Sequence, residues 1–403
     1  MTDAPKPTIL LLASRLGHGG AERHTVTLAN RLSAHFQVVL AYIKDDAALL
    51  EQVDAAKLAA IVCLHSRSGF DRDAVRRLAD VFDRHGPGIV LCANTYPMSY
   101  ALAARRMAAV KPRVIEVYHT TVLPHWKDKL KMLVFHPMMW ALHRLVYVCH
   151  AQRDHWRRRG LRARRETVIH NGVDVQRFDP VPFEAAADEQ RQRYGWNAED
   201  LVVGLCAVLR PEKAPLDLLR AIRRADRGGR RWNALLIGDG PLRPQIEAEI
   251  RNLGLEGRVV ITGLRSDVRA DLAACDAVAL VSVAVETFSI AALEAMAMAK
   301  PLIMSDIGGA KEQVEPGRTG WLFPPGDVEA LARCLEAAGD RAMLRAMGQH
   351  SRERVVRDYA MDTMIERYVT LLNGDLPNAA QDRRLRGRFF DTEDTEAQRT
   401  QRK

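Results

Sequence analysis

The chain has 403 residues, of which 47% are hydrophobic, and this is enough for two domains with buried cores. The formal net charge of +9 is uneven: residues 1–180 contain 27 Lys and Arg against 16 Asp and Glu, whereas the remainder contains 32 against 34. The basic half would suit anionic lipid, nucleic acid or a phosphorylated acceptor.

The cysteines and the apolar runs exclude several classes of protein. Six cysteines are scattered without a Cys-x-x-C pair, which argues against a disulfide framework or a zinc site and for a reducing compartment. No apolar run approaches the roughly 18 residues of a membrane span, and Ile9–Ala13 is too short for a signal peptide. We therefore expect a cytoplasmic protein, with a peripheral position on the inner face of the plasma membrane left open.

Apolar runs and amphipathic segments alternate through the first half of the chain. Strands are expected at 8–14, 36–43, 88–93 and 113–118, and helices at 21–32, 71–85 and 98–109. This βαβ alternation predicts a parallel sheet with helices on both faces.

Candidate ligand residues follow the strands of this sheet, where ligands of such folds collect. The loop RLGHGG follows the first strand, and its Gly19 and Gly20 would let a phosphate or sugar approach backbone N–H groups, although most Gly-Gly pairs are only turns. His119 directly follows the strand 113–118, with a structural role as its alternative. Asn94 and Tyr96 are candidates for acceptor contacts.

Two basic segments come next. Residues 126–145 mix Lys with Trp, Phe, Met and Leu, which suits either a helix on a membrane surface or a core-facing helix broken near Pro137. Residues 153–165 contain seven arginines, which form either a solvated face or a surface for anionic headgroups. We exclude a nucleic-acid site because stacking aromatics are nearly absent and no binding motif accompanies the arginines.

The second half repeats the alternation after a link that contains Pro180 and Pro182. Strands are expected at 201–208, 234–238, 258–262, 278–283, 301–305 and 320–323, and helices at 215–226, 242–254 and 327–338. We predict an N-terminal domain 1–180, joined by a C-terminal helix 352–373, and a C-terminal domain 181–351. Residues 376–403 are polar without an apolar period and are expected to be disordered.

The stretch Val285–Lys300 (VETFSIAALEAMAMAK) is the most informative part of the chain. An apolar helix is expected from near Thr287 to Ala299, with Glu286 before it and Glu294 inside it. Eight helical positions place the two carboxylates about 12 Å apart, with the anion-attracting helix N-terminus between them. This order complements the hydroxyls, diphosphate and hydroxyls of a nucleotide-sugar. Alternatively, Glu294 pairs with a buried Arg or Lys and Glu286 is a surface charge.

Two cations follow the strand 201–208. Arg210 and Lys213 stand in LRPEKAP, before the helix 215–226. Cations at the carboxyl end of a strand are natural ligands for a diphosphate. The sequence therefore predicts a nucleotide-diphosphate site in the second domain.

The motifs resemble a known family. ETFSIAALEAMA with its E-x7-E spacing, KPLIMSDIGGAKE and GWLFPPGD look like the retaining glycosyltransferases of family 4, which have the GT-B fold. The resemblance covers nearly all of 8–350 and includes GGAE at 19–22 and His-Asn-Gly-Val-Asp at 170–174. It implies two Rossmann-like domains facing a central cleft, and transfer of a sugar with retained anomeric configuration.

The resemblance also implies roles for residues. Lys213, helped by Arg210, would neutralise the departing diphosphate, and Glu294 would bind the ribose diol. Glu286 and His119 would contact the sugar, and backbone N–H groups of Thr287, Phe288 and Ser289 would lie near the phosphates. Leu264 and Arg265 would lie against the base, while Gly19 and Gly20 would close over the donor. Val208 stands where the family commonly has an arginine, so the identity of the first cation is open.

The expected enzyme is a metal-independent hexosyl- or N-acetylhexosaminyl-transferase without a cofactor. No Asp-x-Asp stands at a suitable strand end, because Asp71-Arg-Asp73 starts an expected helix. The donor would be UDP- or GDP-linked, and the acceptor a glycan or lipid of bacterial surface polysaccharide or glycolipid synthesis. The alternatives are a nucleotide-sugar 2-epimerase of the same fold and a non-catalytic membrane-peripheral binding protein. A paired-carboxylate hydrolase is disfavoured, because its carboxylates stand only about 5–10 Å apart.

Overall fold

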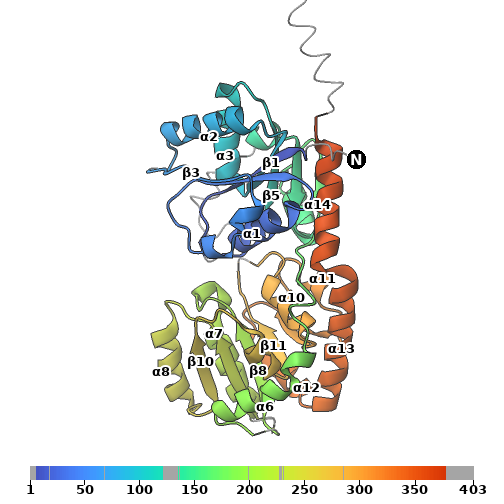
Figure 1. Ribbon diagram of the computed structural model, residues 1–403. Coiled ribbons are helices and arrows are strands. Elements are labelled where there is room, and N and C mark those ends of the chain that lie inside the picture. Colours follow the sequence, from blue (N-terminus) through green and yellow to red (C-terminus); the bar gives the residue numbers. More distant parts are fainter. Residues whose placement is uncertain are drawn as a thin grey trace, which may run out of the picture. The chain divides into compact units, whose positions relative to one another are not determined.

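The chain forms two compact units (Figure 1). This computed structural model describes residues 6–377 except 18, 68, 121–134, 136, 198, 227, 228, 230 and 285. The first unit comprises 1–117, 141–145 and 367–403, and the second comprises 118–140 and 146–366. The tail expected from residue 376 lies outside the described residues from 378 onward, as do residues 126–134 and 136 of the basic segment 126–145. The domain limits expected from the sequence stay a prediction.

The first sheet has seven strands in the order β3-β2-β1-β4-β5-β6-β7. In chain order they are β1 (Thr8–Ala13), β2 (Gln37–Tyr42), β3 (Ala60–Cys63), β4 (Ile89–Ala93), β5 (Arg113–Tyr118), β6 (Arg144–Tyr147) and β7 (Glu166–Val168). The pairs from β3 to β5 are parallel. Five of the six residues of β1 are buried, as a continuous apolar run in a sheet covered on both faces should be. The sequence did not indicate β3, β6 or β7.

The helices that cover this sheet include α1 (Gly20–Leu32), α2 (Arg72–His85) and α3 (Thr95–Met107). Figure 1 shows α2 and α3 on one face and α1 on the other. Helix α2 begins where Asp71 accepts hydrogen bonds from the amides of Asp73 and Ala74, and it ends at Gly86, whose φ of 59° is left-handed. The expected parallel sheet with helices on both faces is confirmed.

The second sheet has six strands in the order β10-β9-β8-β11-β12-β13, and all neighbours are parallel. The strands are β8 (Leu201–Cys206), β9 (Trp232–Ile237), β10 (Val259–Gly263), β11 (Ala277–Leu280), β12 (Leu302–Ser305) and β13 (Gly320–Phe323). The strand order reverses between β8 and β11. Ligands of open parallel sheets bind beyond the carboxyl ends of the strands at this point.

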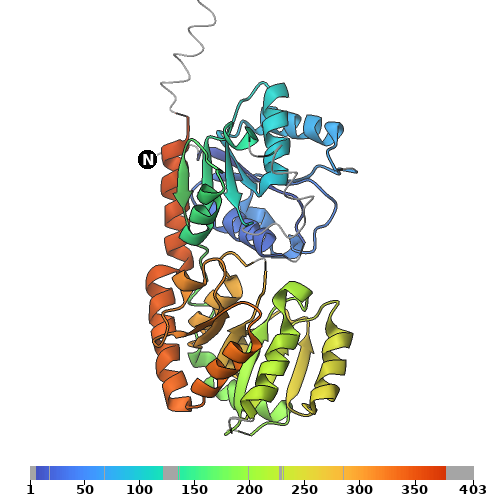
Figure 2. The same cartoon turned by 180° about the vertical axis from the view of Figure 1, so that it is seen from behind.

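The remaining α-helices of the described residues are α5 (His150–Arg158), α6 (Glu184–Arg193), α7 (Pro215–Ala225), α8 (Arg243–Leu253), α9 (Arg269–Ala273), α10 (Ile290–Ala297), α11 (Ala310–Gln313), α12 (Val328–Ala337), α13 (Arg341–Asp358) and α14 (Met361–Asp375). Of these, α7, α10 and α12 contact strands of the second sheet, which Figure 2 shows from behind. Helix α5 instead packs its Trp156 against Tyr118 of β5, and Asp375 at the end of α14 pairs with Arg144 of β6. The core includes Trp232, whose indole N–H donates to the Leu335 carbonyl of α12 at 3.0 Å.

The expected helix 352–373 is wrong as one continuous element, because the chain forms α13 and α14 with a break at Tyr359–Ala360. The Val173 amide donates to the Tyr359 carbonyl at 3.0 Å, and the Met361 amide donates to the Val173 carbonyl at 2.8 Å. This pairing with a distant segment uses backbone groups that a continuous helix would need. In the part of the chain that the structure describes, no helix has both the length and the apolar character of a membrane span.

Candidate functional site

A loop after β8 carries the cation Lys213. Residues Pro211–Lys213 form one turn of 3-10 helix, and Ala214 follows with a left-handed φ of 45° before Pro215 starts α7. The Val283 amide donates to the Glu212 carbonyl at 3.0 Å, which fastens this turn to the loop after β11. The structure thus brings together two loops from the point where the strand order reverses. Arg210 stands exposed at the start of the turn.

Lys213 forms an ion pair with Glu286. Its Nζ lies 2.6 Å from Glu286 Oε2, and the Ser282 hydroxyl donates to the same oxygen at 3.2 Å. The side chains are 27% and 11% exposed, so the pair is only partly screened by water. Two residues that the sequence singled out separately therefore meet.

A glycine pair after β12 supports the loop of Glu286. The Gly309 amide donates to the Thr287 carbonyl at 2.6 Å. Gly308 has φ 57°, and a Cβ there would come within 2.3 Å of the Glu286 carbonyl oxygen. A Cβ at Gly309 would lie 2.7 Å from the Phe288 ring, closer than real Cβ contacts. Only glycine fits at both positions.

Helix α10 begins at Ile290, so the expected start near Thr287 is wrong. Ser289 caps it, since its hydroxyl accepts the Ala292 amide at 3.3 Å. The separation of about 12 Å expected between Glu286 and Glu294 assumed a helix, and the first residues after Glu286 are not helical. Glu294 is 3% exposed within α10.

Gln313 holds the residue that caps α10. Its side-chain oxygen accepts the Ser289 amide at 3.3 Å, and its amide nitrogen donates to the Ser289 carbonyl at 2.8 Å. Gln313 is fully buried. The Ser289 amide, expected to face a phosphate, is therefore used inside the protein. Nothing local in the sequence marked Gln313, because its role depends on packing across two loops.

His119 follows β5 and belongs to the same unit as Glu286. The Thr287 hydroxyl donates to the His119 carbonyl at 2.8 Å. Burial lowers the pKa of His119 to about 4, so the imidazole is neutral near pH 7. The expected contact of His119 with the sugar stays a prediction.

The segment His170–Gly172 packs under the same loop. The Asn171 side chain donates to the Phe288 carbonyl at 2.9 Å, and the ring centroids of His170 and Phe288 lie 4.9 Å apart. His170 Nε2 lies 2.8 Å from Glu312. The sequence marked the motif at 170–174 but gave these residues no part in the site.

The loop expected to face a base is open at its tip. Leu264 is 74% exposed. The Arg265 guanidinium lies 3.1 Å from Asp271 and 3.3 Å from the Tyr194 hydroxyl, so its charge is engaged inside the unit. Gly263 precedes them with φ 73°.

The candidates of the first unit lie at the carboxyl ends of β1 and β4. Gly19 caps α1 and Gly20 begins it, and a Cβ at Gly19 would come within 2.1 Å of the Glu22 carboxylate, which folds back over the turn. Asn94 has a left-handed φ of 73°, and the Tyr96 hydroxyl lies 3.1 Å from that of Tyr100.

Glu116 on β5 is a buried carboxyl that the sequence analysis passed over. It is 0% exposed, the Thr95 hydroxyl donates to its Oε1 at 3.0 Å, and its Oε2 has no partner among the described residues. Burial raises its pKa to about 8. Sequence reasoning assigned RVIEVY to a buried strand, and the single carboxyl within it gave no sign of a separate role.

Comparison with known families covers both halves of the chain. The family described as Glycosyltransferase Family 4 matches residues 18–177, and the family described as Glycosyl transferases group 1 matches residues 186–354. The chain belongs to the family 4 glycosyltransferases. The second match contains Lys213, Glu286 and Glu294.

Curated relatives within this group are distant. The N-acetyl-alpha-D-glucosaminyl L-malate synthase of Bacillus anthracis is 28% identical over 51% of this chain and 52% of its own length. The alpha-D-kanosaminyltransferase of Streptomyces kanamyceticus is 34% identical over 42% of this chain and 44% of its own length. The chain thus spans about half the length of the curated relatives it matches.

Solved structures share the whole architecture. Anabaena Alr3699/HepE in complex with UDP-glucose has a TM-score of 0.80 at 22% identity, covering 91% of this chain and 99% of that one. The sucrose-phosphate synthase of Thermosynechococcus elongatus has a TM-score of 0.76 at 19% identity, with 91% and 99% covered. The expected family 4 glycosyltransferase fold, GT-B with two Rossmann-like sheets, is confirmed.

Proposed function

We propose that this protein is a retaining glycosyltransferase that moves a sugar from a nucleotide-diphosphate-sugar to a glycan or lipid-linked acceptor. The observation that carries the proposal is the Lys213–Glu286 pair, which stands where the strand order of the second sheet reverses. A cation there suits a diphosphate, and a carboxylate beside it suits sugar hydroxyls.

Lys213 would stabilise the leaving group. Departure of a nucleoside diphosphate concentrates negative charge on the phosphates, and a fixed cation lowers that barrier. In the free protein its charge is matched by Glu286 at 2.6 Å. Donor phosphates would take over part of this pairing and leave the Glu286 carboxylate to accept hydrogen bonds from the sugar. Exposed Arg210 would be the second cation.

Glu294 would bind the ribose diol, and His119 would contact the sugar as a neutral imidazole, because its pKa is lowered to about 4. Two amides of the Glu286 loop, those of Thr287 and Phe288, would serve the phosphates and the sugar. The exposed Leu264 loop would lie against the base. We propose no protein nucleophile; the leaving phosphate would assist the incoming hydroxyl on the same face, and no metal would be required.

The partners follow from the same reasoning. Structural neighbours were solved with UDP or UDP-glucose, and one relative is named as GDP-mannose-dependent, so the proposed donor is UDP- or GDP-linked. Relatives include enzymes named for colanic acid and phosphatidylinositol mannoside synthesis, which supports a surface polysaccharide or glycolipid acceptor. Exposed arginines in and after α5 would attract an anionic membrane at the cytoplasmic face: Arg157, Arg158, Arg159, Arg162, Arg164 and Arg165.

A donor panel tests the proposal. Thermal shifts with UDP-, GDP-, ADP- and CMP-sugars identify the nucleotide, and NMR of the product with a candidate acceptor reports the anomeric configuration. We expect transfer with retention, unchanged by EDTA, and loss of transfer in Lys213→Ala. Inverted product would contradict the mechanism.

Two alternatives have distinct outcomes in the same assay. A 2-epimerase would convert the nucleotide-sugar without an acceptor. A non-catalytic binding protein would float with anionic liposomes yet give no product with any donor. The intact Lys213, Glu286, Glu294 and His119 favour the transferase over this binding protein.

A further inference from the structure

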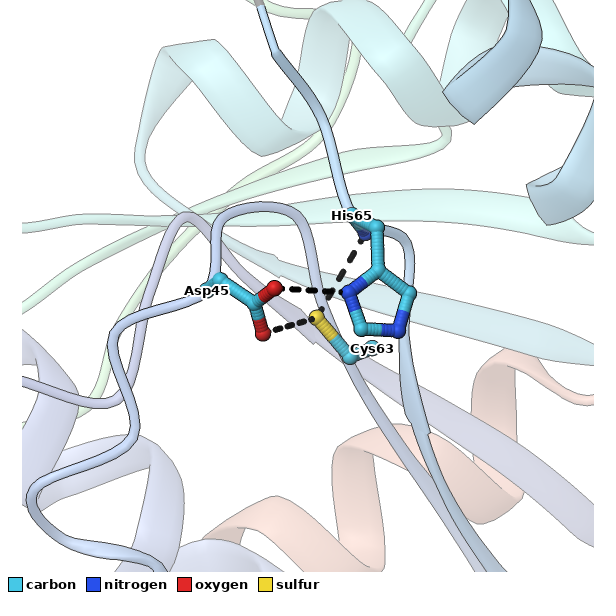
Figure 3. Close-up of side chains that lie close together, drawn as sticks. All are labelled: Asp45, Cys63 and His65. Atoms are coloured by element: carbon cyan, nitrogen blue, oxygen red, sulfur yellow. Dashed lines mark hydrogen bonds and ion pairs between the residues drawn. The ribbon is translucent and has the colours of Figure 1, made fainter.

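Three metal-ligating side chains meet in the first unit, beyond the carboxyl ends of β2 and β3. Strands β2 and β3 are parallel neighbours with Tyr42 opposite Cys63. Asp45 lies three residues after Tyr42, and His65 lies two residues after Cys63. Figure 3 shows their side chains converging from the two strand ends. The group was invisible in sequence, because its members come from two loops and form no Cys-x-x-C pair.

The geometry suits one small cation. His65 Nδ1 lies 2.8 Å from Asp45 Oδ2, and Cys63 Sγ lies 3.4 Å from Asp45 Oδ1. The three ligand atoms all lie within 4.8 Å of one another. In a tetrahedral zinc site, ligands at about 2.0–2.3 Å from the metal stand roughly 3.5 Å apart. Small side-chain shifts would therefore reach zinc geometry.

We propose that Asp45, Cys63 and His65 form a site for a zinc ion, with water as its fourth ligand. A thiolate, an imidazole and a carboxylate together bind Zn²⁺ in preference to Mg²⁺ or Ca²⁺. Three protein ligands leave one position open, and the side chains of Asp45 and His65 are 71% and 63% exposed, so solvent reaches it. The proposal does not depend on the glycosyltransferase function.

The backbone holds the two loops in place without the metal. The Leu64 amide donates to the Tyr42 carbonyl at 2.8 Å, and the Ser66 amide donates to the Ile43 carbonyl at 2.9 Å. Arg77 on α2 donates to the Leu64 carbonyl at 2.9 Å. These bonds extend the β2–β3 pairing through the ligand loops, so little ordering would be needed on binding.

An outer partner is also present. The Tyr42 hydroxyl hydrogen-bonds to the Cys63 thiol. Groups that hydrogen-bond to metal ligands orient them and tune their basicity. Tyr42 would hold the sulfur toward Asp45 and His65.

The protons balance on binding. In the free protein the Cys63 thiol donates to Asp45, and burial raises the pKa of this thiol. Binding of Zn²⁺ would release the thiol proton to solvent. His65 would give the lone pair of Nδ1 to the metal, and a proton on that nitrogen would move to Nε2 or to solvent.

A second group of ligand types, in the second unit, is less suited. His150, His170 and Glu312 also lie within reach of one another. However, the Glu312 carboxylate already accepts the backbone amides of His150 and Ala151 at 3.0 and 2.8 Å, besides pairing with His170. The Glu312 oxygens cap the N-terminus of α5, and a metal would have to replace these hydrogen bonds.

Cobalt(II) titration of the untagged, chelator-treated full chain tests the zinc site. A thiolate-to-cobalt charge-transfer band and tetrahedral d–d bands should appear with one equivalent of Co²⁺, and Zn²⁺ should bleach them. Wild-type protein that gives no such band would overturn the proposal, whatever the variants do. The group at His150 contains no sulfur ligand, so binding there would give no thiolate band.

Variants then assign the ligands. Cys63→Ser should abolish the band, and Asp45→Asn or His65→Gln should weaken Zn²⁺ by more than the roughly 10–100-fold that loss of an outer partner costs. Tyr42→Phe should fall within that range. Cys334→Ser and His35→Gln, which change a thiol and an exposed imidazole elsewhere, should bind as the wild type. A band retained in Cys63→Ser would contradict the site.

Discussion

At the scale of single residues, the proposed donor site depends on the ion pair between Lys213 and Glu286. Replacing Glu286 by glutamine leaves Lys213 without its carboxylate at 2.6 Å. We expect Glu286→Gln to bind the nucleoside diphosphate up to about tenfold more tightly, as loss of a partly screened competitor implies, and to transfer sugar more slowly. Isothermal titration and a transfer assay measure the two effects. Weaker nucleotide binding would show that Glu286 contacts the nucleotide itself.

Removing the proposed nucleotide ligands should lower the affinity for the donor nucleotide, opposite to the effect of Glu286→Gln. Lys213→Ala and Glu294→Ala should each weaken binding of the donor nucleotide while leaving the fold intact, since one cation and one ribose acceptor are lost. Calorimetry gives the affinity, and circular dichroism checks the fold. Unchanged donor affinity in both variants would remove the proposed pocket.

Glu116 makes a pH-dependent contribution to stability. Its pKa is about 8 in the folded protein and near 4.5 when unfolded. Between these values the folded state binds more protons, so the free energy of unfolding falls as pH rises from about 4.5 to 8. Glu116→Gln should lack this fall and gain stability relative to wild type at pH 8 compared with pH 5. Denaturant midpoints at the two pH values test this, and parallel curves would refute it.

At the scale of elements, the turn at Gly308–Gly309 sets the position of the Glu286 loop. Gly309→Ala would press a methyl group to 2.7 Å from Phe288. We expect a loss of about 1–3 kcal/mol of stability, as overpacking usually costs, and a larger loss of transfer. Gly374→Ala in α14, where a Cβ meets nothing within 4 Å, is the matched control. Equal activity in both variants would show that the loop can adapt.

Local pattern explains which elements could be predicted. Apolar runs placed β1, β4 and β5 to within a residue of their bounds, because burial on both faces leaves a continuous signal. The short β3 was missed, since its residues are only half-buried. The division into α13 and α14 could not be predicted from the local sequence, because it depends on backbone hydrogen bonds to the distant Val173.

At the scale of the whole molecule, the proposed donor ligands Lys213, Glu286 and Glu294 all belong to the second unit. Nucleotide should therefore slow hydrogen exchange most in the loop after β8 and in the start of α10. A ligand at 100 times its Kd adds about 2.7 kcal/mol of stability to what it binds. Exchange mass spectrometry with and without nucleotide measures this, and protection confined to α2 and α3 would contradict the assignment.

The architecture was predictable and part of the site was not. Alternation of strands and helices predicts parallel sheets, and the spacing from Glu286 to Glu294 carries a family signature. The pairing of Lys213 with Glu286, which lie 73 residues apart in the chain, depends on which strands become neighbours. Gln313 and Glu116 were missed, and Asn171 was marked without a role, because their roles come from packing and not from local pattern.

Glu312 should be a site of inactivating mutations although it lies outside the proposed set of donor ligands. Its carboxylate begins α5 and pairs with His170, whose ring lies against Phe288 in the loop that presents Glu286. A random screen for inactive alleles should therefore recover changes at Glu312, although the residue is not among the proposed donor ligands. Suppressor mutations of such alleles should cluster around His170 and Phe288. A genetic screen could therefore locate the residues that support the Glu286 loop before any ligand is known.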